Sequence, residues 1–289
     1  MIQRVLENKI REYPVASALE QENTLQEIVQ QVILASLARA GLFSKAQGVF
    51  HGGTCLRIIY GTNRFSEDLD FFLKRPDPNF AWRGFLEHVV RDGKGEGLIF
   101  SVQDKAEDRT AVKKAFLRTD SFSGDPAPVL PYARDTRKPI RVKLEIDVNP
   151  PLGSTFETNY LAFPVTTAIT TQSLSSAFAM KISALLGRAY AKGRDWYDFI
   201  WYINKKIAPD QGLLERALAQ RGPWAGRKIK TDHAWIEASL KKKITEIDWQ
   251  VARRDVERFL PLRDQESLKL WDREFFLHHL RALAVPTQG

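Results

Sequence analysis

Residues 51–73 read His-Gly-Gly-Thr-Cys-Leu-Arg-Ile-Ile-Tyr-Gly-Thr-Asn-Arg-Phe-Ser-Glu-Asp-Leu-Asp-Phe-Phe-Leu, and this stretch decides the fold. It opens on a Gly-Gly-hydroxyl turn, continues through a helical stretch and ends on two aspartates two residues apart in an apolar run. Glycines let backbone amides approach a phosphate closely, helped by the start of the next helix. Carboxylates can hold magnesium beside such phosphates. The order therefore predicts a joint site for a phosphorylated ligand and a metal.

Asp68 and Asp70 are the predicted metal ligands. Side chains alternate along a strand, so the two carboxylates share one face while Leu69 and Phe71 point into the core. Two such carboxylates repel each other unless a cation lies between them. Magnesium held there can activate an attacking oxygen and stabilise a departing pyrophosphate. The alternative is a surface pair or a turn, but burying both aspartates in an apolar strand without a partner would be costly.

The turn before them supplies the predicted phosphate contacts. We expect the backbone amides of Gly52 and Gly53 and the hydroxyl of Thr54 to bind a triphosphate. Ser66 and Arg64 lie two and four residues before Asp68 and could line the mouth of the site. Ser66 is either an ordinary loop residue or a place for inhibitory phosphorylation, since a phosphate there would repel substrate phosphates.

A third carboxylate is expected on a neighbouring strand. Residues 140–148 alternate between apolar and charged side chains, which is typical of a half-buried strand. Glu145, Asp147 and Lys143 share its polar face. Either acid could be a metal ligand, or the base for an attacking hydroxyl, and their spacing does not separate them. The alternative is a solvated face of an edge strand.

The chain becomes helical after about residue 165. Lys181 and Arg188 share one helical face, where they could hold a phosphate, although Lys181 could equally extend along a helix edge. Asp195 and Asp198 share another face at a spacing of three residues. Asp195 could be a site residue, a helix cap or an ion-pair partner of Arg188.

The pattern as a whole predicts an α/β (α+β) fold: a mixed-sheet core over 1–165 and a helical domain over 166–289. We expect strands over 47–50, 68–73 and 140–148 and two more within 98–117, and a proline-bearing irregular segment over 120–139. Helices are expected over 21–42, 54–60, 80–90, 173–186, 195–204, 213–220, 234–243, 251–259 and 267–284.

Composition limits the class of protein. The 289 residues carry a net charge of +8, and residues 181–230 contain 11 Lys and Arg against 4 Asp and Glu. This surplus favours a polyanionic partner such as RNA, and the basic segment 221–230 is the expected contact; the alternative is an ordinary solvated helical surface and loop. Cys55 is the only cysteine, and no apolar run is long enough to cross a membrane. We expect a cytoplasmic protein without a disulfide.

These residues together resemble the AbiEii/AbiGii family of nucleotidyltransferase toxins, which belong to bacterial abortive-infection and toxin–antitoxin systems. The resemblance is carried by Phe50-His-Gly-Gly-Thr-Cys-Leu56, Arg64-Phe-Ser-Glu-Asp-Leu-Asp-Phe71, Lys143-Leu-Glu-Ile-Asp147, Lys181-Ile-Ser-Ala-Leu-Leu-Gly-Arg188 and Arg194-Asp-Trp-Tyr-Asp-Phe199.

The resemblance implies a polymerase-β-like nucleotidyltransferase core followed by a helical domain that completes the active site. It implies Mg²⁺, a nucleoside triphosphate, an RNA acceptor for which tRNA is a candidate, and a cognate antitoxin protein or adjacent-gene repressor. Gly53 and Thr54 would contact the triphosphate, Asp68 and Asp70 the metal, and Lys181 a phosphate, with Asp195 and Asp198 closing the site. The family often has Ser in place of Thr54.

Two other functions fit parts of the pattern. The first is a nucleotidyltransferase that modifies a small molecule of the antibiotic type, which the basic second half disfavours. The second is a non-catalytic protein that binds nucleotide or RNA, which the intact Asp68 and Asp70 pair disfavours.

Overall fold

The computed structural model describes residues 8–13, 15–104, 110–122, 130–132 and 139–285. The chain forms two compact units: the first holds Met1–Pro150 and Phe156–Thr171, and the second holds Pro151–Thr155 and Gln172–Gly289. The predicted division lies between residues 165 and 166. The structure places it six residues later, because the strand β7 (Thr167–Gln172) hydrogen-bonds to the sheet of the first unit.

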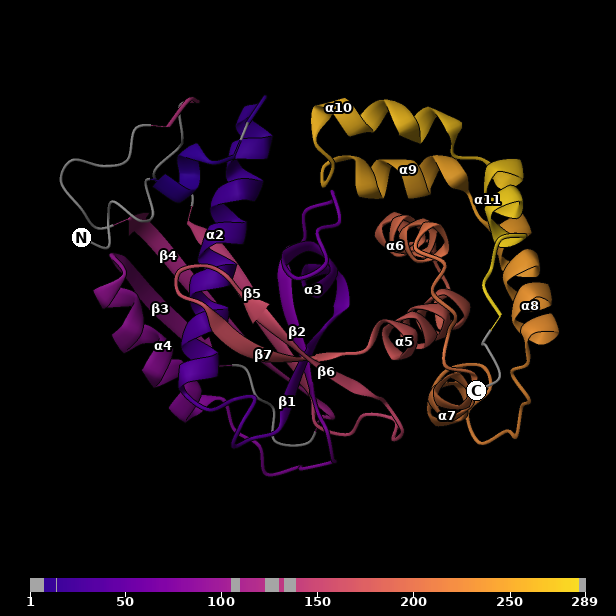
Figure 1. The fold of residues 1–289 in the computed structure, drawn as a ribbon, viewed down its shortest axis with the longest axis horizontal. Coiled ribbons are helices and arrows are strands. Elements are labelled where there is room, and N and C mark those ends of the chain that lie inside the picture. The colour runs from indigo at the N-terminus through magenta and orange to yellow at the C-terminus, as the bar shows by residue number, and fades with distance from the viewer. Residues whose placement is uncertain (1–7, 14, 105–109, 123–129, 133–138, 286–289) are drawn as a thin grey trace. The chain divides into compact units, whose positions relative to one another are not determined.

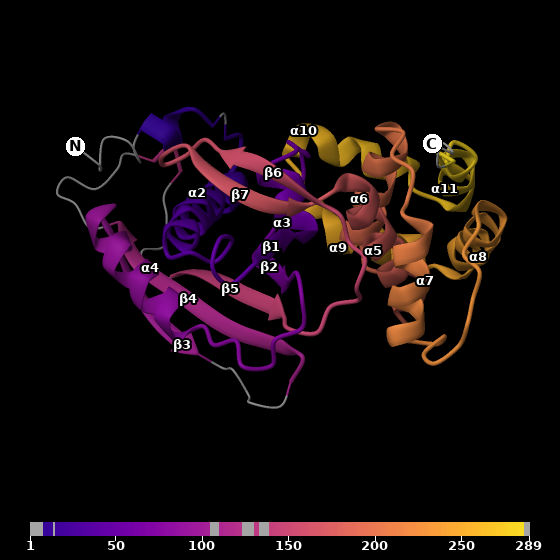
Figure 2. The same ribbon diagram turned by 60° about the horizontal axis from the view of Figure 1, so that its bottom comes forward.

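The first unit is built on a mixed seven-stranded sheet with the order β3-β4-β5-β2-β1-β7-β6 (Figures 1 and 2). In the sheet, β2 pairs antiparallel with β1 and parallel with β5, while β4 pairs antiparallel with both β3 and β5. The bounds of the strands are Gly48–His51 (β1), Asp68–Leu73 (β2), Leu98–Asp104 (β3), Val112–Phe122 (β4), Ile140–Asp147 (β5), Phe156–Leu161 (β6) and Thr167–Gln172 (β7). The predicted mixed α/β class is confirmed.

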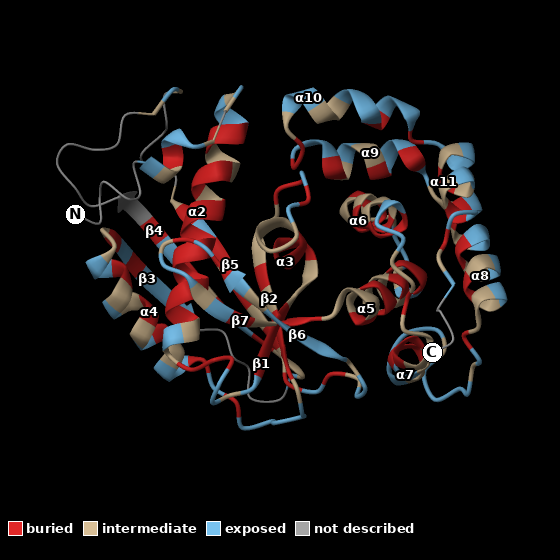
Figure 3. Cartoon of the chain, in the orientation of Figure 1, coloured by how far each residue is buried: buried red, intermediate tan, exposed pale blue. Residues whose placement is uncertain are grey.

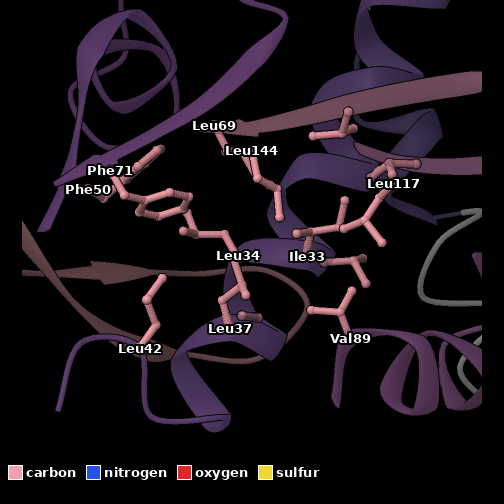
Figure 4. Close-up of a cluster of buried hydrophobic side chains, with 14 of the residues drawn as sticks. Ile33, Leu34, Leu37, Leu42, Phe50, Leu69, Phe71, Val89, Leu117 and Leu144 are labelled. Atoms are coloured by element: carbon pink, nitrogen blue, oxygen red, sulfur yellow. The ribbon is translucent and has the colours of Figure 1, made fainter. Parts of the chain in front are cut away.

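One face of this sheet is apolar and carries the core. Helices α2 (Ala18–Arg39) and α4 (Arg83–Gly95) pack on each other and on strands β5 and β3. Leu69 and Phe71 of β2 are buried in this core, as predicted, together with Leu144 of β5. Figure 4 shows the side chains of these strands meeting those of α2 and α4. Burial on this face fixes which side chains of each strand point to the opposite face.

Alternation in β5 follows the sequence prediction. Val142, Leu144 and Ile146 are fully buried, and the charged residues between them are exposed or half-buried. The other face of β5 therefore presents charged side chains.

The second unit is helical. Its helices are α5 (Leu174–Gly187), α6 (Gly193–Asn204), α7 (Gln211–Gln220), α8 (His233–Glu246), α9 (Trp249–Glu257), α10 (Leu262–Gln265), the 3₁₀ turn η1 (Glu266–Leu270) and α11 (Arg273–Leu280). Aspartates cap several of them: the side chains of Asp210, Asp232, Asp248 and Asp272 each accept a hydrogen bond from a first-turn amide. Figure 3 shows buried and exposed faces on these helices, as amphipathic packing requires.

An aromatic cluster forms the centre of this unit. The rings of Trp249 and Phe276 stack 3.9 Å apart, and Trp196 meets both edge-on at 5.3 and 5.5 Å. Trp196 is buried, so it belongs to the core of this unit.

Several expectations about secondary structure were wrong. The chain was expected to be helical after about residue 165, but β7 occupies Thr167–Gln172, and β6 was not predicted. The expected helix over 267–284 is interrupted, because Trp271 is extended and Asp272 caps a new helix. The expected irregular segment over 120–139 begins later, since β4 continues to Phe122; residues 123–129 and 133–138 lie outside the described part. Within the described residues, no helix is both long and apolar enough to cross a membrane.

Candidate active site

The glycine turn lies against one of the two aspartates. Strand β1 ends at His51, which is the register partner of Asp70, and helix α3 (Gly52–Ile58) begins at the next residue. Gly52 has φ +79°, and a Cβ atom there would lie 2.8 Å from Oδ2 of Asp70. Only glycine satisfies both conditions, so the amides at the start of α3 lie next to a carboxylate.

Gly53 is required for a different reason. A Cβ atom there would lie 2.1 Å from Nη2 of Arg64, whose side chain is buried. The predicted place of Arg64 is the mouth of the site; the structure instead packs its guanidinium group against the turn, where Nη1 donates to the carbonyl of Phe65 at 3.1 Å. A positive charge in this position favours an anion bound to the turn.

Thr54 has a different contact from the one predicted. Its side chain is fully buried, and its hydroxyl donates to the carbonyl oxygen of Asp68. This bond ties the first turn of α3 to the start of β2. The backbone of Thr54 remains part of the turn, but its hydroxyl proton is already used.

Asp68 and Asp70 lie on the polar face beside charged residues of β5. The parallel register pairs Asp68 with Lys143 and Asp70 with Glu145. Lys143 Nζ is 2.8 Å from Glu145 Oε2 and 3.9 Å from Asp68 Oδ2. Burial and then the charge of Asp70 raise the pKa of Asp68 to about 6, although Lys143 acts in the opposite direction. Burial opposes the charge of Lys143, yet the hydrogen bond to Glu145 and the charge of Asp68 raise its pKa.

The register also separates the two candidates for the third carboxylate. Glu145 is level with Asp70, whereas Asp147 is level with Phe72, one side-chain repeat further along the strand. The Asp147 carboxylate accepts a hydrogen bond from the amide of Asn149 at 2.8 Å. Among the residues that the structure describes, no three Asp, Glu, His or Cys side chains form a ligand set for a metal, so neither acid completes one with Asp68 and Asp70.

The donor set nevertheless suits Mg²⁺ that is bound together with a substrate. Magnesium is commonly held by one or two carboxylates plus substrate phosphates, which needs no all-protein cage. Asp68 and Asp70 share a strand face, and burial followed by the charge of Asp70 raises the pKa of Asp68. Gly52 lies so close to Asp70 that a Cβ atom there would be 2.8 Å from Oδ2. These residues fit a cation shared with a phosphate at the turn.

The segment that leads into Asp68 is held by residues that the sequence patterns did not single out. Arg57 of α3 donates to the carbonyls of Thr62 and Asn63, both at 2.9 Å, and Arg57 Nε forms an ion pair with Glu27 at 2.7 Å. An arginine three residues after the predicted turn was the available signal. The half-buried Ser66 is held through its own carbonyl, which accepts from Gln30 at 2.9 Å.

The predicted residues of the helical unit form one ion cluster. Lys181 Nζ of α5 is 2.7 Å from Asp195 Oδ1 and 2.9 Å from Asp198 Oδ2, both on α6. Arg188 Nε is 3.1 Å from Asp195 Oδ2, so Asp195 is the ion-pair partner of Arg188 and not a helix cap. Burial alone would raise the pKa of Asp195, but Lys181 and Arg188 together lower it to about 2. The cluster joins α5 to α6.

Comparison with solved structures shows which proteins share this fold. The solved structures similar to this chain include a putative nucleotidyltransferase and JHP933, both from Helicobacter pylori, and the nucleotidyltransferase toxin MenT4 from Mycobacterium tuberculosis. Each is 19% identical to this chain. The putative nucleotidyltransferase has a TM-score of 0.50, and the match covers 90% of this chain and 91% of that one. The values are 0.51, 90% and 89% for JHP933, and 0.50, 98% and 99% for MenT4. No curated protein matches the chain.

The family follows from the sequence match. The family model described as nucleotidyl transferase AbiEii toxin, type IV TA system, matches residues 32–278. The chain therefore belongs to the AbiEii family of nucleotidyltransferase toxins, and the resemblance noted from its motifs is confirmed. It is a nucleotidyltransferase.

We expect Asp68→Asn to raise the melting temperature of the metal-free protein at about pH 7.5. A raised carboxyl pKa stabilises the folded state below the ordinary value of 3.8, and this contribution is lost as pH rises through about 6. The gain should therefore shrink as pH falls from about 7 to about 4. Thermal unfolding in EDTA measures it, with Glu67→Gln as the neighbouring control. An equal gain at both ends of the range would contradict the electrostatic origin.

We expect Asp195→Asn to lower the free energy of unfolding by about 3 kcal/mol at neutral pH, because it breaks a buried ion cluster. The lowered pKa contributes stability above about pH 4, and that contribution is lost as pH falls toward about 2. Urea unfolding at about pH 7 and pH 3 checks both. The control is Glu87→Gln in the exposed pair with Arg83, which should cost about 0.5 kcal/mol or less. A similar loss of unfolding free energy in both variants would contradict the claim that the buried cluster stabilises the fold more than the exposed pair does.

Proposed function

We propose that this nucleotidyltransferase transfers a nucleotide from a nucleoside triphosphate to an RNA acceptor, with Mg²⁺, and thereby arrests growth. The supporting observation is the close approach of the glycine turn to the carboxylate pair, since a Cβ atom at Gly52 would lie 2.8 Å from Oδ2 of Asp70. A cytoplasmic location would follow from an RNA acceptor, for which tRNA is a candidate.

The residues of the sheet unit have distinct roles in this proposal. Asp68 and Asp70 hold the cation, while the amides of Gly52 and Gly53 hold the triphosphate with support from Arg64. When bound, Mg²⁺ neutralises phosphate charge and stabilises the leaving pyrophosphate.

Glu145 is our choice for the third acid because its register partner is Asp70, and its ion pair with Lys143 fixes its orientation. In the transfer, the acceptor hydroxyl gives its proton to a carboxylate, and its oxygen forms a bond to the α-phosphorus. The bond between the α-phosphorus and the oxygen that bridges to the β-phosphorus breaks, and pyrophosphate leaves.

The proposal also gives a role to two cationic side chains of the helical unit. Asp195 and Asp198 hold the ammonium group of Lys181 in one place, which is the preorganisation that a phosphate contact needs. We assign Lys181 and Arg188 to the triphosphate, and Asp195 and Asp198 to positioning them. The type IV toxin–antitoxin description of the family also leads us to propose a cognate antitoxin.

We expect Asp70→Asn to reduce nucleotide transfer at least about a hundredfold, because one metal ligand is removed. The assay incubates the protein with each labelled triphosphate, total cellular RNA, and either Mg²⁺ or EDTA. Glu12→Gln, an exposed acid, is the control and should behave as wild type.

The same assay distinguishes the other functions. Label in RNA that requires both Mg²⁺ and Asp70 supports the proposal. Label confined to small molecules would instead favour the antibiotic-type transferase, and triphosphate binding without transfer of any label would favour a binding protein.

A further inference from the structure

An exposed aromatic ring stands between two helices of the helical unit. Tyr190 lies in the connection between α5 and α6 and is 66% exposed, although large aromatic side chains usually bury most of their surface. Arg188 Nη1 lies 3.4 Å from the Tyr190 hydroxyl, and Lys192 follows two residues later. The ring is therefore flanked by cations on both sides along the chain.

A second basic segment lies beside this connection. Gly222, in the loop between α7 and α8, has φ +85°, and a Cβ atom there would be 3.8 Å from the Cα of Gly187 at the end of α5. The beginning of residues 221–230 thus lies beside the residue that precedes 188–192, although the two ranges are distant in sequence. We refer to these two ranges together as the basic face.

The charge of the basic face has one sign. The first range contains two Lys and Arg and the second contains four, and neither contains an Asp or Glu. Two of these cations have acidic partners outside the ranges: Arg188 pairs with Asp195, and Lys230 lies 3.9 Å from Asp232. The pKa of Lys192 is lowered by burial and then, against the effect of Asp195, by the nearby charges of Arg194 and Arg188. Asp195 is already shared between Lys181 and Arg188. Such a surface attracts a polyanion.

Trp224, the aromatic residue of 221–230, is less exposed than Tyr190. The ring of Trp224 meets that of Trp235 edge-on at 5.8 Å and is half-buried, so it anchors its loop to α8. Lys243 of α8 also donates to the carbonyl of Arg188 at 2.6 Å, which holds the first range in place. Tyr190, and not Trp224, is the ring of the basic face that is open to a planar ligand.

We infer that Tyr190 is a stacking platform for one base of a single-stranded nucleic acid whose phosphates lie on the basic face. An exposed ring among cations, with no acid in either range, is the combination that binds single strands without reading sequence. A folded acidic protein would use the charges but would not require the ring. The inference refines the RNA acceptor of the proposed function, yet it concerns binding and not chemistry.

The test measures the affinity of the full-length protein for a fluorescent single-stranded RNA of about 12 nucleotides, by anisotropy, over a series of salt concentrations. Tyr190→Ala should weaken binding about 5- to 100-fold with an unchanged salt slope, because stacking releases no counterions. Tyr190→Phe should bind nearly as wild type. Changing Arg227, Lys228 and Lys230 to Gln should reduce the salt slope by about 2, at about 0.7 for each phosphate that the variant no longer neutralises.

The matched control is Tyr160→Ala, because Tyr160 is 69% exposed but lies on β6 of the sheet unit. The inference is overturned if Tyr190→Ala binds RNA as wild type, or if Tyr160→Ala weakens binding as much. It is also overturned if polyglutamate of similar length competes as well as unlabelled RNA.

Failure of the proposed function has a different signature. A wild-type protein that binds RNA through Tyr190 but transfers no nucleotide would refute only the chemistry.

Discussion

The sheet unit is organised around two like charges that must stay close together. Asp68 and Asp70 share a strand face, and burial with mutual repulsion raises the pKa of Asp68 to about 6. This arrangement is opposed by the repulsion between two like charges. It persists because the alternate residues Leu69 and Phe71 are buried on the other face, so the carboxylates cannot turn away without exposing the core. The antiparallel pairing of His51 with Asp70 then brings the glycine turn to the same place.

Nearby cations reduce the repulsion between Asp68 and Asp70 but do not abolish it. Lys143 pairs mainly with Glu145 and only distantly with Asp68, and Arg64 is packed against the turn. The strand thus carries two carboxylates, while the neighbouring turn carries backbone amides and the guanidinium group of Arg64. That separation suits a ligand in which a cation and phosphates arrive together. In the helical unit the buried carboxylates have a cation as partner, because Asp195 and Asp198 both form ion pairs with Lys181.

Much of the strand pattern of the sheet unit could be predicted from the sequence, because periodicity shows which face of a strand is buried. The limits of β2 and the alternation in β5 were predicted correctly. Periodicity does not report register, so the sequence could not show that Glu145 is the register partner of Asp70 and Asp147 that of Phe72. The edge strand β6 was missed because five of its six residues are not buried and so give no alternating signal. The roles of Thr54 and Arg57 depend on contacts with residues 14 and 30 positions away, which local patterns do not contain.

The central claim is that the glycine turn and the carboxylate pair form one site for a metal and a triphosphate. Calorimetric titration of wild-type protein with non-hydrolysable analogues of the four triphosphates, in Mg²⁺ and in EDTA, tests it most directly. The tightest analogue should bind at least about tenfold more strongly in Mg²⁺. Gly53→Ala, whose added methyl group would meet Arg64, should weaken binding in both buffers, whereas Asp70→Asn should remove only the Mg²⁺-dependent part. Equal affinity of the wild type with and without Mg²⁺ would contradict the account.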